Sequence, residues 1–128
     1  MPRSSMPGRV LVVDDEEPIR ILIQRLLSRY GFSVETAPDG AAAIDRLAQE
    51  DFDAVVLDLM MPKIDGFTVL RQLIATNPEL VSRVVVATAY PRDVANRHLT
   101  EVCHVIIKPF DTTQLVEAVQ ECVGRAPS

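Results

Sequence analysis

Four short apolar runs, separated by spacers of helix length, most strongly constrain how this chain can fold. Each run is continuous rather than alternating, and three of the four are rich in β-branched residues. A continuous apolar run is typical of a strand that is covered on both faces, as in a parallel sheet. The runs lie at residues 10–13, 54–57, 84–87 and 105–107. Residues 33–36 alternate between apolar and polar, which indicates an edge strand with one wetter face.

The first spacer has the pattern of an amphipathic helix. Pro18 lies in the expected first turn, where a helix tolerates proline, and Gly31 lies where glycine ends many helices. Apolar residues recur at i, i+3, i+4, i+7 and i+11, so they share one helical face. This face, which we expect to point inward, holds Ile19, Leu22, Ile23, Leu26 and Tyr30.

Aspartates stand where three later helices are expected to begin. Asp39 can cap a helix over residues 41–48, and Asp65 marks the start of the next helix. Asp111 can cap the last helix, where Gln114 is placed to complete a capping box. The expected inner faces are Ile44, Leu47 and Ala48, then Phe67, Leu70 and Ile74, and finally Leu115, Ala118, Val119 and Cys122.

Strands and helices therefore alternate along the whole chain. This order predicts an α/β fold, (βα)₅, with a doubly wound five-stranded parallel sheet, right-handed crossovers and helices on both faces. A shorter helix is expected at residues 92–100. The 128 residues fit one domain, which we expect to span residues 9–123. Residues 1–8 and 124–128 are expected to form disordered tails.

Composition and charge narrow the class of protein. No apolar run approaches the roughly 20 residues needed to span a bilayer, and the first residues lack the apolar core of a signal peptide. We therefore expect a cytoplasmic protein that does not bind membranes, with Cys103 and Cys122 as reduced thiols rather than a disulfide or a metal site. The net charge of −5 argues against a nucleic-acid-binding surface.

The residues that close the predicted strands carry charges and a hydroxyl. Asp14 and Asp15 follow the first strand, Asp58 ends the third, Thr88 ends the fourth and Lys108 follows the fifth. In an open α/β sheet the ligand site lies beyond the carboxyl ends of the strands. These side chains are therefore expected to converge on one small region.

Each of these residues also has an ordinary explanation. An acidic run such as residues 14–17 is typical of a solvated helix start, and a threonine commonly ends a strand. Lys108 is harder to explain in this way, because it is one of only two lysines among thirteen basic residues and directly follows a buried strand. Asp58, likewise, is a carboxylate between Leu57 and Leu59. The convergence of all of them favours a functional site.

Clustered carboxylates suit a divalent cation. Oxygen-only ligands indicate Mg²⁺ or Mn²⁺ rather than zinc. With a metal bound, Asp58 remains as a nucleophile that can form an acyl phosphate. The cation and Lys108 would neutralise the phosphoryl oxygens, and Thr88 could donate a hydrogen bond to one of them.

Four linked motifs match the pattern of a known protein family. VLVVDDEEPIR, DAVVLDLMMPKIDG, VVVATAY and VIIKPF occur in order and at the expected spacing. Over residues 9–123 the chain resembles the receiver domains of two-component response regulators. We expect the flavodoxin-like strand order 2-1-3-4-5. The resemblance implies a phosphorylation switch that receives its phosphoryl group from a histidine kinase or a histidine phosphotransfer protein and acts on an unknown downstream protein.

The resemblance also implies a role for each site residue. Asp58 would be the phospho-acceptor, and the protein's metal ligands would come from Asp14, Asp15 (the closer ligand), Asp58 and the backbone carbonyl of Met60. Lys108 would pair with the phosphoryl group, and Thr88 would move to contact it after phosphorylation.

The chain matches the receiver pattern in its local backbone features and departs from it at one position. The family implies a cis Lys108–Pro109 bond, and Pro62 and Gly66 match the turn that shapes the loop after Asp58. The family usually has an aromatic residue three positions before the lysine, where this chain has Val105. The usual read-out of phosphorylation is therefore in question.

Other classes of protein remain as alternatives. An aspartate-nucleophile phosphatase or dehalogenase needs a second acid two residues after the nucleophile, where this chain has Met60. Flavodoxin needs a glycine-rich phosphate loop after the first strand, where residues 14–17 would repel a phosphate. A pseudo-receiver that is never phosphorylated is a further alternative. Met1 and the short C-terminal tail slightly favour a stand-alone regulator over a receiver cut from a longer protein.

Overall fold

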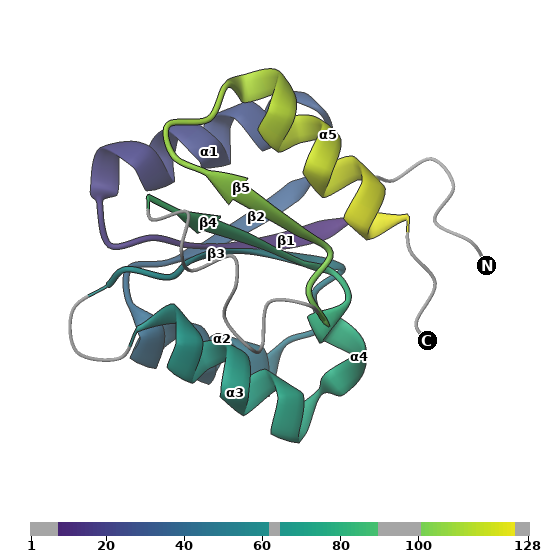
Figure 1. Cartoon of the computed structure of the whole chain (residues 1–128). Helices are drawn as coiled ribbons and strands as arrows, with labels where there is room; N and C mark the ends of the chain where they lie inside the picture. The colour runs from purple at the N-terminus through teal and green to yellow at the C-terminus, as the bar shows by residue number, and fades with distance from the viewer. Residues whose placement is uncertain (1–7, 62–64, 90–100, 125–128) are drawn as a thin grey trace.

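A computed structural model describes residues 8–61, 65–89 and 101–124. It contains a five-stranded parallel sheet in the order β2-β1-β3-β4-β5, as predicted (Figure 1). Pro62, the helix expected at residues 92–100 and most of the two expected tails lie outside the described residues. The strands are β1 (Arg9–Val13), β2 (Ser33–Ala37), β3 (Ala54–Asp58), β4 (Val84–Thr88) and β5 (His104–Ile107).

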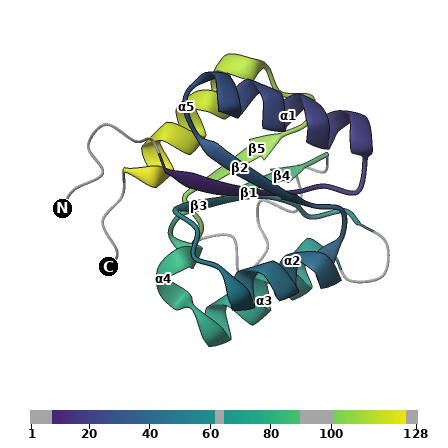
Figure 2. The same ribbon diagram turned by 180° about the vertical axis from the view of Figure 1, so that it is seen from behind.

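Helices cover both faces of the sheet. One face carries α1 and α5, and the other carries α2, α3 and the short α4 (Figures 1 and 2). The central strands β1, β3 and β4 are almost completely buried between these layers, as their continuous apolar runs predict. The edge strand β2 is largely half-exposed, as its alternating pattern predicts. The helices are α1 (Glu17–Arg29), α2 (Gly40–Gln49), α3 (Gly66–Thr76), α4 (Pro78–Val81) and α5 (Thr112–Val123).

The predicted helix boundaries are set by local chemistry. The carboxylate of Asp39 accepts a hydrogen bond from the Ala42 amide at 2.8 Å, and that of Asp65 accepts one from the Thr68 amide at 3.0 Å. Asp111 likewise caps α5. The structure differs from these expectations in two ways: α2 spans residues 40–49 rather than 41–48, and residues 78–81 form an additional short helix, α4.

The inner faces of three helices differ in part from the sequence prediction. In α1, Leu22 and Tyr30 are 55% and 52% exposed, whereas Leu27 is fully buried. The reason is geometric: Ile23 and Leu27 lie at i and i+4, in the centre of the contact with the sheet, and Leu22 lies about 100° away around the helix. In α2, Ala43 is buried and Ala48 is exposed.

In α3 the contact is centred on Val69, Leu70 and Leu73, whereas Phe67 and Ile74 lie half-buried at its margins. The predicted inner face of α5 is confirmed, because all four of its residues are buried. No helix in the described ranges has the length and apolar character that a membrane crossing requires.

The expectation of two reduced thiols is wrong: Cys103 and Cys122 form a disulfide, with their Cα atoms 5.9 Å apart. Cys122 is fully buried on the inner face of α5, and Cys103 directly precedes β5, against which α5 packs. The two sulfur atoms therefore meet through tertiary packing, across a sequence separation of 19 residues.

Candidate functional site

The register of the central strands brings two carboxylates side by side. Val13 at the end of β1 pairs with Leu57 in β3. The residues that follow them, Asp14 and Asp58, therefore lie next to each other at the carboxyl edge of the sheet. Both side chains are buried, although each is a charged group at the end of an apolar strand.

The register of the last two strands adds Lys108 to the same edge. Thr88, the buried last residue of β4, pairs with Ile107 in β5. The Lys108 amide donates a 2.7 Å hydrogen bond to the Thr88 carbonyl, which fixes the start of the loop after β5. The Lys108–Pro109 peptide bond is cis, as the resemblance implied.

Three carboxylates form a compact acidic cluster at this edge. Asp14, Asp15 and Asp58 each place one oxygen atom within 4.8 Å of the others, with Asp15 exposed and the other two buried. The backbone orients both buried carboxylates: Oδ1 of Asp14 accepts from the Glu16 amide at 2.9 Å, and Oδ1 of Asp58 accepts from the Met60 amide at 3.1 Å. The carboxylate positions are thus held by the loops that follow β1 and β3.

Lys108 lies between the two buried carboxylates. Its Nζ atom is 3.5 Å from Oδ2 of Asp14 and 3.5 Å from Oδ1 of Asp58. Among the described residues, one ammonium thus faces a cluster of three acids, so these four groups keep a net negative charge when all three acids are ionised. Such a cluster suits a divalent cation or a second positively charged group.

The buried position of Asp58 changes its titration. The pKa of Asp58 is raised from an ordinary 3.8 to about 6, chiefly by burial and to a smaller extent by the nearby charges of Asp14 and Asp15. The hydrogen bond from the Met60 amide and the charge of Lys108 act in the opposite direction. At neutral pH Asp58 is mostly ionised, but its charge is poorly solvated, so binding a cation stabilises it.

Gly66 allows the backbone around Asp58 to pack closely. A Cβ atom on Gly66 would lie 2.5 Å from the carbonyl oxygen of Asp58 and 2.6 Å from the Cα of Leu59. The Gly66 amide also donates to the Leu59 carbonyl at 3.1 Å. Only glycine fits here, which explains physically why the turn pattern after Asp58 contains it.

One contact of the site has no signal in the sequence. The Nη1 atom of Arg20, in the first turns of α1, donates a 2.9 Å hydrogen bond to the backbone carbonyl of Asp14. It connects α1 to the loop that carries the acidic cluster. Nothing in the spacing of Arg20 indicates this contact, because it depends on how α1 turns back over β1.

An apolar hollow of about 400 Å³ opens beside the acidic cluster. It lies between α1 and the loop after β5, and the exposed side chain of Leu22 is part of its wall. The buried carboxylates therefore lie beside an apolar surface that solvent can reach. Its lining consists of Glu16, Ile19, Leu22, Ile23, Ala89, Lys108, Pro109 and Phe110.

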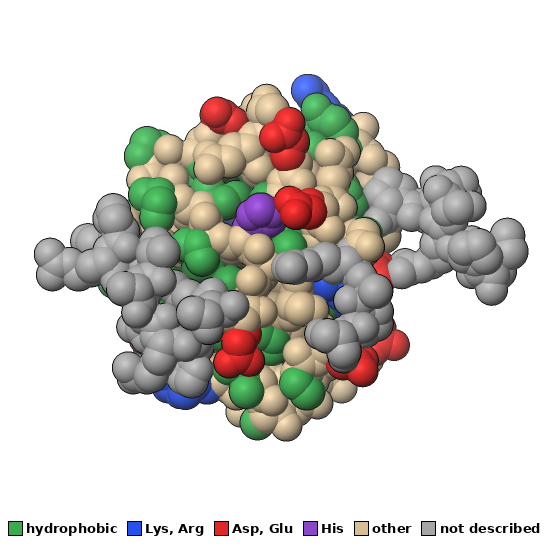
Figure 3. Space-filling view, turned by 45° about the vertical axis from the view of Figure 1, so that its right-hand side comes forward, with side chains coloured by type: hydrophobic (Ala, Val, Ile, Leu, Met, Phe, Trp, Pro, Cys, Tyr) green, Lys and Arg blue, Asp and Glu red, His purple; other side chains and the backbone are tan. Residues whose placement is uncertain are grey.

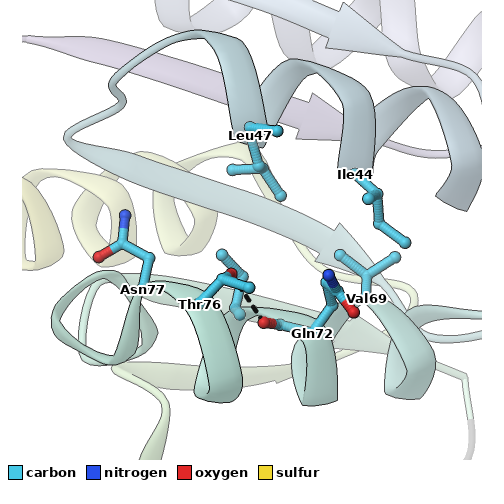
Figure 4. A pocket seen from close by; sticks show the side chains of 8 residues that line it. Ile44, Leu47, Val69, Gln72, Thr76 and Asn77 are labelled. Carbon is cyan, nitrogen blue, oxygen red and sulfur yellow. Dashed lines mark hydrogen bonds between the residues drawn. The ribbon is translucent and has the colours of Figure 1, made fainter.

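A second hollow, of about 310 Å³, lies between α2 and α3, and its walls carry no charged group (Figure 4). Ile44 and Leu47 approach it from α2, and Val69, Gln72 and Thr76 from α3. The Thr76 hydroxyl donates to the Gln72 carbonyl within the helix at 2.8 Å. The residues that line it include no ionisable side chain, and the Thr76 hydroxyl has no neighbouring base there, so this hollow offers no chemistry comparable to that of the acidic cluster.

Fold and site together define a class: a doubly wound parallel α/β domain with an acidic cluster and one lysine at the carboxyl edge of its sheet. The chain belongs to the response regulator receiver domain family, whose model matches residues 10–120. It is therefore a phospho-accepting receiver, a signalling switch rather than an enzyme.

Individual relatives agree with this assignment. The response regulator MprA of Mycolicibacterium vanbaalenii is 50% identical over 82 residues, a match that covers 64% of this chain and 36% of that protein. The chain thus matches about a third of the length of this relative. The structure of the response regulator TrrA from Thermotoga maritima, in complex with Mg(2+)-BeF, is 29% identical with a TM-score of 0.82. That match covers 89% of this chain and 97% of TrrA.

The receiver domain of a Francisella response regulator is similar to the same degree, with 26% identity and a TM-score of 0.82. That match covers 91% of this chain and 96% of the Francisella chain.

Proposed function

We propose that Asp58 is the phospho-acceptor of this receiver. The observation that carries the proposal is the setting of its carboxylate. Asp58 is buried at the end of the central strand β3, is oriented by the Met60 amide and lies 3.5 Å from the Lys108 ammonium. Of the other two clustered acids, Asp15 is exposed, whereas Asp14 shares the burial, the orienting amide and the 3.5 Å contact with Lys108. Asp58 is preferred over Asp14 because it holds the acceptor position of the receiver motif, and because Gly66 packs closely against its backbone.

The acidic cluster fits a bound Mg²⁺, with Mn²⁺ as a substitute. All three clustered side chains offer hard oxygen ligands, and Lys108 alone does not neutralise them. We propose that Asp14, Asp15, Asp58 and the backbone carbonyl of Met60 hold the ion. When bound, the ion supplies positive charge next to the transferring phosphoryl group. The Mg(2+)-BeF complex of the Thermotoga relative supports this choice of metal.

The chain's own residues then have separate tasks. A carboxylate oxygen of Asp58 forms the new P–O bond while the P–N bond of a donor phosphohistidine breaks, and the leaving imidazole nitrogen keeps the bonding electrons and takes a proton from solvent. The Lys108 ammonium neutralises charge on the phosphoryl oxygens, and the Thr88 hydroxyl moves to donate to one of them. Holding the carboxylate in place is the task of the Met60 amide and of the close packing at Gly66.

Partners and location follow from the same proposal. A phosphohistidine donor means a histidine kinase or a histidine phosphotransfer protein, and the phosphorylated domain would act on a downstream protein. We place this exchange in the cytoplasm and assign it to a receiver domain over residues 9–123. Glutathione and thioredoxin keep most cytoplasmic thiols reduced, so the Cys103–Cys122 disulfide would be open to reduction in that compartment.

The experiment is phosphate uptake from acetyl phosphate, measured as intact mass. The wild-type chain should gain one phosphate in the presence of Mg²⁺ and none when the metal is chelated. Asp58→Asn keeps the shape of the side chain but removes the nucleophile, so it should take up no phosphate. Undiminished uptake by Asp58→Asn at the wild-type rate would refute the assignment.

A further inference from the structure

The amino end of β5 carries a second cluster of metal-ligating side chains. Cys103, His104 and Cys122 each place one sulfur or ring nitrogen atom within 4.8 Å of the others. Cys103 directly precedes β5, His104 is its first residue, and Cys122 lies in the last turn of α5. The acidic cluster follows the carboxyl ends of the strands, so the two groups of ligands lie at opposite ends of β5.

A carboxylate already orients the histidine. Nε2 of His104 lies 2.6 Å from Oε1 of Glu121 on α5. Figure 3 shows a histidine on this face of the molecule with acidic side chains near it. If Glu121 keeps Nε2, the Nδ1 atom of His104 is left for a metal, which gives the carboxylate–histidine–metal arrangement of many zinc sites. A hollow of about 230 Å³, lined in part by His104, Glu117 and Glu121, opens the His104 side of the cluster to solvent.

We propose that reduction of the Cys103–Cys122 disulfide creates a binding site for a thiophilic divalent cation of the Zn²⁺ class. Cys103, Cys122 and His104 are the ligands, and Glu121 is a positioning residue that holds the His104 ring. The fourth position of a tetrahedral ion is left to water. This site is independent of phosphorylation at Asp58.

The chemistry of the switch balances. A dithiol reductant gives two electrons and two protons to the disulfide, which becomes two thiols while the reductant forms its own disulfide. The metal then displaces the two thiol protons and binds both thiolates. Two thiolates cancel the charge of the divalent ion, and the neighbouring Glu117 and Glu121 also favour a cation here. In the oxidised chain both sulfur atoms are bonded to each other and neither is a thiolate.

The ligand spacing suits this metal. Ligand atoms around tetrahedral zinc lie about 3.3–3.8 Å apart, given zinc bonds of about 2.0–2.3 Å. The ligand atoms already lie within 4.8 Å of one another, and the two sulfur atoms, bonded to each other in the oxidised chain, must move apart to the zinc spacing after reduction. Cys122 is buried on α5, whereas Cys103 and His104 are half-exposed. Sulfur and imidazole ligands select zinc-like ions, whereas the oxygen ligands of the acidic cluster select Mg²⁺.

The test uses Co²⁺ as a spectroscopic substitute for Zn²⁺ on the full chain. The protein is reduced with a dithiol, freed of reductant without oxygen and titrated in excess Mg²⁺, which fills the acidic cluster. We expect one Co²⁺ per chain, a thiolate-to-cobalt charge-transfer band and the visible bands of tetrahedral cobalt. Zn²⁺ should displace the cobalt. The oxidised chain should show none of these bands, and this comparison requires no mutation.

Variants then identify the ligands. Cys103→Ser and His104→Ala alter half-exposed residues and should abolish or strongly weaken the cobalt signal. Glu121→Gln should weaken cobalt binding by roughly 10–100-fold, as loss of an orienting carboxylate does. Glu117→Gln, one helical turn earlier on α5, is the matched control and should change the affinity less than about threefold, because Glu117 does not hold the ring. Circular dichroism checks that each variant is folded.

Three results would overturn the proposal. The first is a reduced wild-type chain that shows no thiolate-to-cobalt band. The second is a band that persists at wild-type affinity in folded Cys103→Ser or His104→Ala. The third is equal binding by the oxidised and reduced chains, which would mean that the sulfur atoms are not ligands.

Discussion

The two ends of β5 present basic side chains in different surroundings. At the carboxyl end, the Lys108 side chain is 21% exposed and lies 3.5 Å from two buried carboxylates. At the amino end, the His104 side chain is 38% exposed and contacts the more exposed carboxylate of Glu121. At the carboxyl end, three carboxylates offer hard oxygen ligands but repel one another. At the amino end, the ligand atoms are sulfur and nitrogen, and a disulfide joins the two sulfur atoms. The choice of ligand atoms and their burial, rather than net charge alone, separates the two sites.

The largest expected effect comes from replacing Lys108, the positively charged side chain at the carboxyl end of β5. Lys108→Met keeps an apolar stem of similar length but leaves Asp14 and Asp58 without their ammonium. We expect the rate of phosphate uptake from acetyl phosphate with Mg²⁺ to fall on the order of 10²-fold, as when one charge-stabilising donor is lost. His104→Ala is the matched change at the amino end and should leave this rate within about twofold. Equal losses in both variants would mean that the two ends of β5 are not separate.

Backbone packing also differs between the two regions, and it gives the second prediction. Gly66 touches the backbone of Asp58, whereas a Cβ on Gly124, two residues after Cys122, would make only ordinary contacts at 3.6 Å. Gly66→Ala should therefore lower the free energy of unfolding by about 2–3 kcal/mol, the cost of a clash that the backbone must relieve. Gly124→Ala should change it by no more than about 0.5 kcal/mol.

Urea unfolding measures both glycine variants. Gly66→Ala should also slow phosphate uptake, because the relief of the clash moves the Asp58 carbonyl. A Gly66→Ala protein as stable as Gly124→Ala would show that the loop after β3 is not tightly packed.

The smallest expected effect is a dependence of stability on pH. The folded pKa of Asp58, about 6, lies above its ordinary value of 3.8, so between these values the folded chain binds more protons than the unfolded chain. The contribution of Asp58 to stability is therefore favourable at low pH and is lost as the pH rises through about 6. Since solvent screening reduces the full linkage value, we expect Asp58→Asn to be more stable than the metal-free wild type at pH 7 by roughly 1–2 kcal/mol.

Thermal or urea unfolding at pH 4 and pH 7 measures this difference in stability. The pH dependence of Mg²⁺ affinity provides a second measurement. The ion binds the ionised carboxylate, so its affinity for the wild type should fall as the pH drops below about 6. A stability gap between the two proteins that is the same at both pH values would contradict the raised pKa.

Much of the fold and the site follows from rules that act along the chain. Continuous apolar runs place the central strands, and the rule for carboxyl ends of strands brings Asp14, Asp58 and Lys108 together before any coordinates are known. Caps at Asp39 and Asp65 follow from local hydrogen bonding. These features depend either on residues that are close in sequence or on the general rule that the carboxyl ends of parallel strands lie at the same edge of the sheet.

The missed features depend on packing between distant segments. The helical pattern of α1 fits two adjacent apolar stripes and so predicts that Leu22 points inward, but only the contact with the sheet selects the stripe through Leu27. The disulfide was missed because Cys103 and Cys122 meet only where α5 crosses β5. The contact of Arg20 with the Asp14 carbonyl has the same origin.

The central claim is that phosphate is carried by Asp58 and by no other acid of the cluster. Borohydride reduces an acyl phosphate on aspartate to homoserine, which peptide mass spectrometry locates by residue. After phosphorylation of the wild-type chain with acetyl phosphate and Mg²⁺, the conversion should appear at position 58 and be absent when Mg²⁺ is chelated. Conversion at position 14 or 15, or Mg²⁺-dependent phosphate uptake without conversion at position 58, would contradict the account.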